Sequence, residues 1–206
     1  MPKITACRSC GQQNLETVLD LGHTPLADRL PTEEQLKQAE PSFPLEVGFC
    51  PDCGLMQILE TVPPSVLFCE DYPYYSSFSD ALLRHSRENT LDLIDRRKLD
   101  KASLAVELAS SDGYMLKNYV ENGIPVLGID PAEGPAREAE KINVPTLNEF
   151  FTLELANELS EQGKSADVIH GNNVLAHVAD TNGFVEGIQV LLKPGGVAVI
   201  EAPYVK

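Results

Sequence analysis

No stretch of the sequence is apolar and uncharged over the roughly 20 residues that a bilayer-spanning helix needs. The opening residues, MPKITACRSC, also lack the apolar segment of a secretory signal peptide. Basic side chains are scarce, since 16 Lys and Arg stand against 31 Asp and Glu, a net charge of -15, and neither half of the chain has a basic excess that would suit a nucleic-acid backbone. The sequence therefore predicts a soluble, cytoplasmic protein that binds neither membranes nor nucleic acids.

The composition is that of a globular chain. Of its 206 residues, 43% are hydrophobic and 23% are charged. This is enough apolar material for a core, and the length fits one ordinary domain or two small ones.

Four of the five cysteines form two pairs with the same spacing. Cys7 and Cys10 stand in CRSCG, and Cys50 and Cys53 stand in CPDCG. Two thiolates on one tight turn can hold a zinc ion, and a second such turn completes a tetrahedral site with four cysteine ligands. Two disulfides and a thioredoxin-like redox pair are the alternatives. The predicted cytoplasmic location and the lack of a strand-to-helix context disfavour both.

A site with four cysteine ligands leaves no position open for water or substrate, so the zinc ion is expected to be structural. The N-terminal segment is small and rich in proline, and zinc binding would supply much of its folding free energy. The long spacing between the two pairs predicts a small insertion, such as the proline-bounded stretch 25–44. Cys69, in LFCEDY, is expected to pack as a small hydrophobic side chain.

From residue 103 onward, short apolar runs alternate with helical patterns. The runs are rich in Val, Ile and Leu and predict strands at 103–109, 125–130, 144–147, 166–171 and 195–202. Helical spacing predicts helices at 79–99, 113–123, 131–143, 152–164 and 180–193. This order predicts an α/β fold with a parallel sheet and helices on both faces.

Ligands of such a sheet bind beyond the carboxyl ends of its strands. The first predicted strand runs into ELASSDG, a turn of small residues that lets the backbone approach a ligand closely. The second strand ends at Asp130, which is placed to accept two hydrogen bonds from a ribose diol, and the fourth runs into GNNVLAH. Together these strand exits predict a nucleoside cofactor pocket.

The same turn favours S-adenosylmethionine over NAD. A dinucleotide site requires G-x-G-x-x-G beneath its pyrophosphate, whereas here Gly113 is preceded by Ala109, Ser110 and Ser111. Glu107 and Asp112 would repel a pyrophosphate, and a carboxylate suits the ammonium group of a methionine moiety. A plain packing turn is the alternative, because small residues after a strand are common.

The order of the motifs resembles that of the zinc-containing, S-adenosylmethionine-dependent sugar C-methyltransferases, which act on nucleotide-linked 4-keto deoxysugars in bacterial natural-product pathways. The motifs are CRSCG, CPDCG, EDYPYYSSFSD, VELASSDGYMLK, GIDPA, FF, GNNVLAHVAD and IEAPY, and they run from Cys7 to Tyr204. The resemblance implies a Rossmann-like class I methyltransferase sheet. It implies a zinc-binding domain at 1–70, a linker with an active-site tyrosine and a helix at 71–100, and a cofactor-binding domain at 101–206.

The resemblance also implies roles for individual residues. The cofactor-binding elements correspond to Glu107, the turn Ala109–Gly113 and Asp130, with Asn172 and Asn173 beside the methionine end. The histidine proposed as general base corresponds to His177, and an active-site tyrosine corresponds to Tyr72. The family removes a proton next to the sugar ketone, and the resulting enolate attacks the sulfonium methyl group.

Several of these residues also have a purely structural interpretation. His177 could be a satisfied, partly buried histidine, and Tyr72 could pack with Tyr74 and Tyr75. His170 is expected to be structural. The serines that follow the tyrosines are turn and N-cap candidates or neighbours of a cofactor carboxylate: Ser76, Ser77 and Ser79.

The family's sheet continues beyond the fifth strand and is followed by a further domain with an acid-histidine pair, whereas this sequence ends at Lys206. We therefore expect cofactor binding to persist, turnover on a nucleotide sugar to be impaired, and the edge of strand 196–201 to associate with another chain. The alternative function is a non-catalytic, zinc-stapled binding or assembly module. An NAD-dependent oxidoreductase is disfavoured by the missing glycines.

Overall fold

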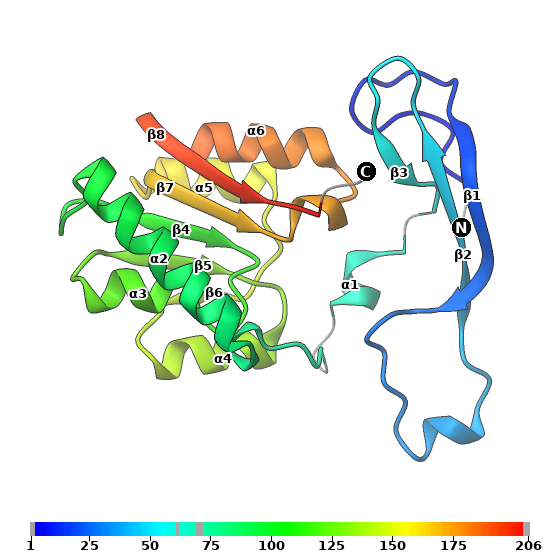
Figure 1. The fold of residues 1–206 in the computed structure, drawn as a ribbon, viewed down its shortest axis with the longest axis horizontal. Coiled ribbons are helices and arrows are strands. Elements are labelled where there is room, and N and C mark those ends of the chain that lie inside the picture. The colour runs from blue at the N-terminus through cyan, green and yellow to red at the C-terminus, as the bar shows by residue number, and fades with distance from the viewer. Residues whose placement is uncertain (1–2, 61, 69–71, 204–206) are drawn as a thin grey trace. The chain divides into compact units, whose positions relative to one another are not determined.

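The computed structural model describes residues 3–203 except 61 and 69–71, so Cys69 and Tyr204 lie outside the described residues. The chain divides into two compact units (Figure 1). The first comprises the described part of residues 1–72 together with 179–182, and the second comprises 73–178 and the described part of 183–206. Each unit is described by itself below.

The N-terminal unit is built on a three-stranded antiparallel sheet in the order β1-β2-β3. Its strands are β1 (Glu16–Pro25), β2 (Ser42–Phe49) and β3 (Met56–Ile58). The loop between β1 and β2 carries a short 3-10 helix, η1 (Gln35–Lys37), and a one-turn helix, α1 (Pro64–Leu67), follows the sheet. The insertion predicted at 25–44 is thus the connection of a β-hairpin.

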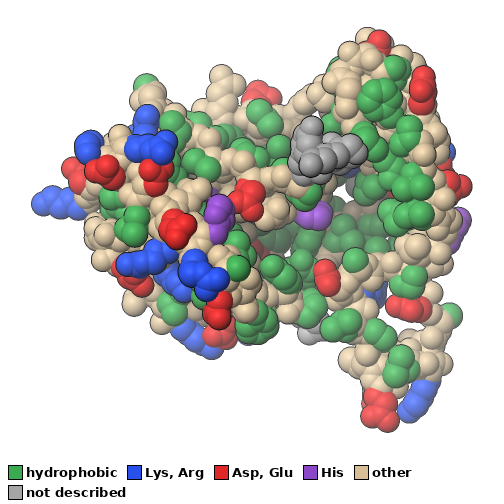
Figure 2. All heavy atoms as spheres, viewed as in Figure 1, with side chains coloured by type: hydrophobic (Ala, Val, Ile, Leu, Met, Phe, Trp, Pro, Cys, Tyr) green, Lys and Arg blue, Asp and Glu red, His purple; other side chains and the backbone are tan. Residues whose placement is uncertain are grey.

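This unit has a small apolar interior. Its buried hydrophobic side chains, among the described residues, are Cys7, Cys50 and Leu59. Gly48 allows Leu59 to pack on the sheet, because a Cβ atom at Gly48 would lie 2.6 Å from Leu59 Cδ2. Apolar side chains on the strands are exposed instead, as the green surface in Figure 2 shows; they include Leu19, Leu21, Met56 and Ile58.

The second unit contains a five-stranded sheet in the order β6-β5-β4-β7-β8, and all its neighbouring strands pair in parallel. The strands are β4 (Ala105–Leu108), β5 (Val126–Ile129), β6 (Thr146–Leu147), β7 (Ala166–Asn172) and β8 (Leu192–Glu201). Each overlaps a strand predicted from the sequence. The predicted α/β class with a parallel sheet is confirmed.

Helices cover both faces of this sheet (Figure 1). The helices are α2 (Asp80–Arg97), α3 (Leu116–Glu121), α4 (Glu133–Lys141), α5 (Leu153–Glu161) and α6 (Thr181–Leu191), with 3-10 turns η2 (Ser76–Phe78) and η3 (Leu175–His177). Residues of α3 and α4 pack with Ala105 and Val126 on one face, and α2 adds Ile94 there. Residues of α5 and α6 pack with Val106 and Ile169 on the other.

Local sequence explains where these helices begin. Ser79 caps α2, since its hydroxyl accepts a hydrogen bond from the Leu82 amide at 3.3 Å, and Thr152 caps α5 through the Leu155 amide at 3.2 Å. Among the described residues, every helix is too short or too polar to cross a bilayer.

Candidate functional site

The four predicted metal ligands lie together in the N-terminal unit. Their sulfur atoms all lie within 4.8 Å of one another. The sulfurs of Cys7 and Cys53 are 3.5 Å apart, and those of Cys10 and Cys50 are 3.6 Å apart. A disulfide bond is about 2.05 Å long, so the four are free thiols and the disulfide alternative does not hold.

The two cysteine turns share one backbone design. The Gly11 amide donates to the Cys7 carbonyl at 2.9 Å, and the Gly54 amide donates to the Cys50 carbonyl at 2.8 Å. Both glycines have a positive φ, 76° and 78°, which explains why each CxxC is followed by glycine. The repeated turn brings two pairs of sulfurs to one point from two segments that are far apart in the sequence.

The electrostatics of this cluster suit a cation. Burial acts to raise the pKa of Cys7, but the Cys10 and Ser9 amides lower it, and the result is about 7. The Leu55 amide acts to lower the pKa of Cys53, but burial and the three neighbouring sulfurs raise it to about 12. Four thiolates this close repel one another unless a metal ion lies between them, and four sulfur ligands are a common set for structural zinc.

In the second unit, the predicted cofactor turn follows β4 at the carboxyl end of the sheet. Ala109, Ser111 and Gly113 have positive φ angles of 57°, 49° and 77°. Every second residue of the turn is thus left-handed, a conformation that glycine adopts without strain and other residues adopt at a cost. Gly113 also packs closely, because a Cβ atom there would lie 3.2 Å from Val144 Cβ.

Asp130, directly after β5, is tied to this turn. One carboxylate oxygen accepts a hydrogen bond from the Ser111 amide at 2.7 Å, and the other accepts one from the Ala132 amide at 2.8 Å. Burial raises the pKa of Asp130, although these two amides act to lower it. Each carboxylate oxygen retains a second lone pair, so the side chain keeps acceptor capacity for a ligand.

The segment that precedes α2 is hydrogen-bonded to the cofactor turn. The Ser76 amide donates to the Ser111 hydroxyl, and the Ser77 amide donates to the Asp112 carboxylate, both at 3.2 Å. These serines act through their backbone, whereas Ser79 is the N-cap of α2. A hollow of about 450 Å³ opens beside this contact, lined by Tyr75, Ser77, Phe78, Asp112, Tyr114, Lys117, Glu138 and Ile142.

Glu107 lies in β4 just ahead of the turn and is 1% exposed. Neither of its carboxyl oxygens has a hydrogen-bond partner. Burial raises the pKa of Glu107 well above its usual range; Tyr114 acts to lower it, and the charges of Asp130 and Asp112 raise it further. A buried acceptor without a donor is costly, so this carboxyl group fits a cationic or N–H-bearing ligand group.

Asn172 and Asn173, at the end of β7, reach two different partners. The Asn172 amide donates to the Tyr114 hydroxyl at 3.4 Å. Asn173 is left-handed, with φ 53°, and its backbone amide donates to the Glu201 carbonyl at 2.7 Å. The structure therefore joins Asn172 to Tyr114, which follows the cofactor turn directly, and Asn173 to the end of β8.

The predicted catalytic pair falls in different units. His177 ends η3 after β7 and is exposed, so it is not packed in hydrocarbon. Tyr72 belongs to the first unit, where its ring meets Phe68 edge-on with centroids 5.5 Å apart. His170 is fully buried, as expected of a structural histidine.

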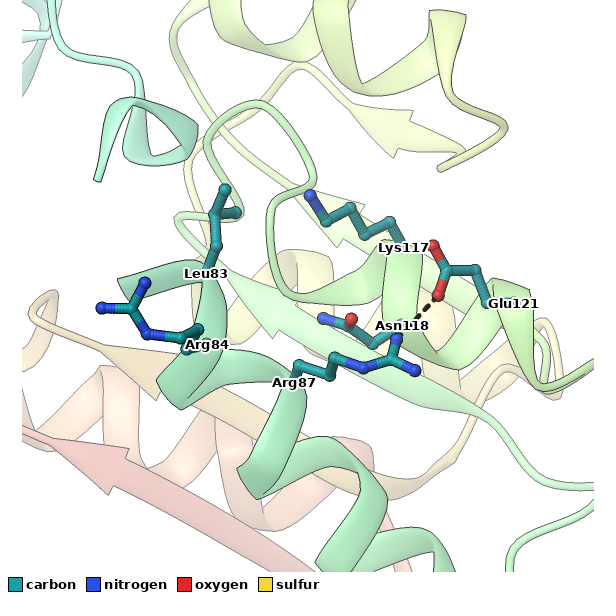
Figure 3. Close-up of a pocket in the computed structure, with 6 residues that line it drawn as sticks. All are labelled: Leu83, Arg84, Arg87, Lys117, Asn118 and Glu121. Atoms are coloured by element: carbon teal, nitrogen blue, oxygen red, sulfur yellow. Dashed lines mark hydrogen bonds and ion pairs between the residues drawn. The ribbon is translucent and has the colours of Figure 1, made fainter. Parts of the chain in front are cut away.

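A second hollow of about 280 Å³ lies between α2 and α3 and carries three basic side chains (Figure 3). The Arg87 guanidinium turns to Glu121 at 3.0 Å, while Arg84 and Lys117 extend in other directions. The cationic groups do not converge on one point. This hollow therefore has no arrangement that would hold a single anion.

The sequence matches two family models, one of a zinc binding domain over residues 7–68 and one of a methyltransferase domain over residues 106–198. The chain is also 33% identical to C-methyltransferase NovU of Streptomyces niveus over 201 residues. This match covers 98% of this chain and 48% of that protein. The chain therefore carries a zinc binding domain followed by a methyltransferase domain. The resemblance seen in the motifs is confirmed, as are the predicted cofactors, S-adenosylmethionine and zinc.

Other similar proteins share less identity with the chain. Ubiquinone biosynthesis O-methyltransferase of Bartonella bacilliformis is 26% identical over 129 residues, which cover 60% of this chain and 52% of that protein. Among solved structures, DesVI of Streptomyces venezuelae has 17% identity and a TM-score of 0.47, over 59% of this chain and 51% of that one. The chain spans about half the length of the curated relatives named here.

Sequence reasoning missed two tyrosines near the candidate cofactor site. The Tyr114 hydroxyl accepts a hydrogen bond from Asn172 and acts to lower the pKa of Glu107, and the Tyr119 hydroxyl is hydrogen-bonded to His170. Tyr114 stands directly after Gly113, which is a signal that could have drawn attention to it. The pairing of Tyr119 with His170 depends on the order of the strands and has no signal in the sequence.

Proposed function

We propose that this chain is the zinc- and cofactor-binding part of an enzyme that transfers a methyl group from S-adenosylmethionine to a carbon atom of a nucleotide-linked keto-deoxysugar. The observation that carries the proposal is the set of three buried carboxyl groups at the carboxyl ends of β4 and β5, one of them without any donor. They are Glu107, Asp112 and Asp130. The similarity to a C-methyltransferase supports carbon as the acceptor.

The residues around the turn fit the two ends of this cofactor. Asp130 retains lone pairs for a ribose diol, and Glu107, with Tyr114 beside it, is an acceptor for the ammonium group. Asn172 lies beside Tyr114 and would face the methionine end. When bound, the cofactor supplies an activated methyl group, which becomes bonded to carbon as its bond to sulfur breaks.

We further propose that His177 and Tyr72 handle the substrate. An imidazole can remove the proton next to a ketone if a donor stabilises the enolate oxygen that forms. His177 is exposed and can accept this proton, and the Tyr72 hydroxyl can donate to the enolate oxygen. Alignment of carbon, methyl and sulfur then supplies much of the rate.

Cofactor binding is tested by isothermal titration with S-adenosylhomocysteine. We expect wild-type protein to bind it and Asp130→Asn to bind about tenfold more weakly, because a charged acceptor becomes a neutral one. Asp95→Asn is the matched control, since Asp95 is exposed on α2 and pairs with Lys98. If folded wild-type protein releases no heat on titration, the proposal is contradicted and the alternative function, a non-catalytic binding or assembly module, is favoured.

Proton removal is tested by deuterium exchange into a nucleotide-linked keto sugar in D2O. We expect exchange at the carbon next to the ketone with the wild-type chain and about 100-fold slower exchange with His177→Gln. Tyr72→Phe should slow exchange to a similar extent, because one donor to the oxyanion is lost. Equal exchange rates in all three proteins would exclude these roles.

A further inference from the structure

The sheet and the helices α2 and α3 that pack on one of its faces contribute buried polar side chains, among them Glu107 on β4, His170 on β7, Tyr119 on α3 and Thr90 on α2. Glu107 and His170 are lateral partners in the parallel β4–β7 ladder. Their side chains therefore leave the sheet on the same face. The Tyr119 hydroxyl and His170 Nε2 are hydrogen-bonded at 2.8 Å.

The polar atoms of this group are incompletely paired. Both Glu107 carboxyl oxygens, His170 Nδ1 and the Thr90 hydroxyl lack a hydrogen-bond partner. Nearly all buried polar groups in proteins are paired, to each other or to an ordered water molecule. An internal water needs a polar site with two to four partners, and these three side chains offer both donors and acceptors.

The protonation of His170 makes the unpaired atoms complementary. Burial lowers the pKa of His170 to about 4, so its ring is neutral near pH 7 and carries one N–H. When that proton is on Nδ1, the Tyr119 hydroxyl donates to Nε2 and Nδ1 becomes a donor. Glu107, on the neighbouring strand, is an acceptor without a donor.

We propose that His170 and Tyr119 are positioning residues for Glu107, which they hold beneath the cofactor turn through one internal water molecule shared with Thr90. This inference rests on the proposed function, in which Glu107 faces the ammonium group of the cofactor. The other titratable groups that act on Glu107 are Tyr114, which directly follows the turn, Tyr119 from α3, Asp112 from the turn and Asp130 after β5.

The test measures the affinity for S-adenosylhomocysteine as a function of pH. Tyr119→Phe and His170→Phe each remove the donor chain while keeping a ring in the core. We expect affinity to fall about tenfold at pH 7, because the ionised form of Glu107 loses a donor. The pH at which affinity is half-maximal should rise by about one unit, because a shift of one pH unit corresponds to the same free energy as a tenfold change in affinity.

A double-mutant cycle with Glu107→Gln separates positioning from packing. In the Glu107→Gln background, Tyr119→Phe should leave the affinity unchanged, because the carboxylate that it positions is gone. Ser86→Ala is the matched control, since Ser86 is buried on α2 and its hydroxyl donates to the Leu82 carbonyl. It should leave both the affinity and the pH profile unchanged.

The outcomes are distinct. Variants that lower the melting temperature but keep wild-type affinity and pH profile would assign His170 and Tyr119 a purely structural role and overturn the inference. An equal loss of affinity in the wild-type and Glu107→Gln backgrounds would overturn it too. Folded wild-type protein that does not bind S-adenosylhomocysteine would overturn the proposed function, and the inference with it. If His170→Phe does not fold, Tyr119→Phe decides alone.

Discussion

The two units of this chain obtain their stability in different ways. The N-terminal unit has few buried apolar side chains and brings four thiols within 4.8 Å of one another. The methyltransferase unit has apolar clusters on both faces of its sheet. It also contains buried carboxyl groups and a turn with left-handed Ala and Ser. A large core can tolerate the cost of a polar site, whereas a small one depends on a ligand to fold.

Metal removal should have the largest effect and should be confined to one unit. Structural zinc contributes on the order of 10 kcal/mol to the folding of small domains. We expect a strong chelator, or Cys50→Ser, to unfold residues 3–60 while the parallel sheet stays folded. Amide chemical shifts report both units in one spectrum. An unchanged N-terminal unit in metal-free protein would show that its own packing is sufficient.

Truncation of apolar side chains should instead destabilise the methyltransferase unit more than the N-terminal unit. Leu159→Ala removes a buried side chain of α5 and should cost the methyltransferase unit about 3 kcal/mol of unfolding free energy. Leu21→Ala removes a side chain that is 54% exposed on β1 and should change stability by less than about 0.5 kcal/mol. Urea unfolding measures both. Equal losses would mean that the zinc unit has more apolar packing than its burial indicates.

The two units also differ in how well the sequence predicts them. Each strand of the parallel sheet was predicted because a strand buried on both faces is a continuous apolar run. The prediction of β8 at 195–202 began late, since the strand starts at Leu192 and passes through Pro194 and Gly195, which normally mark a turn. The strands of the N-terminal unit were not predicted, because β1 is exposed, irregular and interrupted by Gly22.

The candidate site residues also differ in how well the sequence predicts them. The cysteines could be predicted from spacing alone, since both halves of the metal site are local turns. Glu107, Asp130 and Asn172 could be predicted because strand exits meet at one edge of a parallel sheet. The contact between Tyr119 and His170 could not, because it arises only when β7 is placed beside β4.

The buried carboxyl group of the methyltransferase unit should give a pH signature. Burial raises the pKa of Glu107 above its ordinary value of 4.5, so its contribution to stability is present below pH 4.5 and is lost as the pH rises toward the raised value. Glu107→Gln should therefore gain stability relative to wild type between pH 5 and pH 8, by about 1–3 kcal/mol. Glu154→Gln, on exposed α5 surface, is the control. A constant difference across this range would show that the pKa of Glu107 is not raised in the folded protein.

Relief of backbone strain in the cofactor turn should give the smallest change in stability, and this change should be a gain. Ala109 has φ 57°, which costs an L-residue about 1–2 kcal/mol, while glycine adds about 0.5–1 kcal/mol of unfolded-state entropy. Ala109→Gly should therefore stabilise the methyltransferase unit by about 0.5–1 kcal/mol in urea unfolding. Ala105→Gly, in the buried strand β4, should destabilise it, because no strain is relieved there. If both variants lose stability, the turn is relaxed in solution and the left-handed residues do not distinguish this unit.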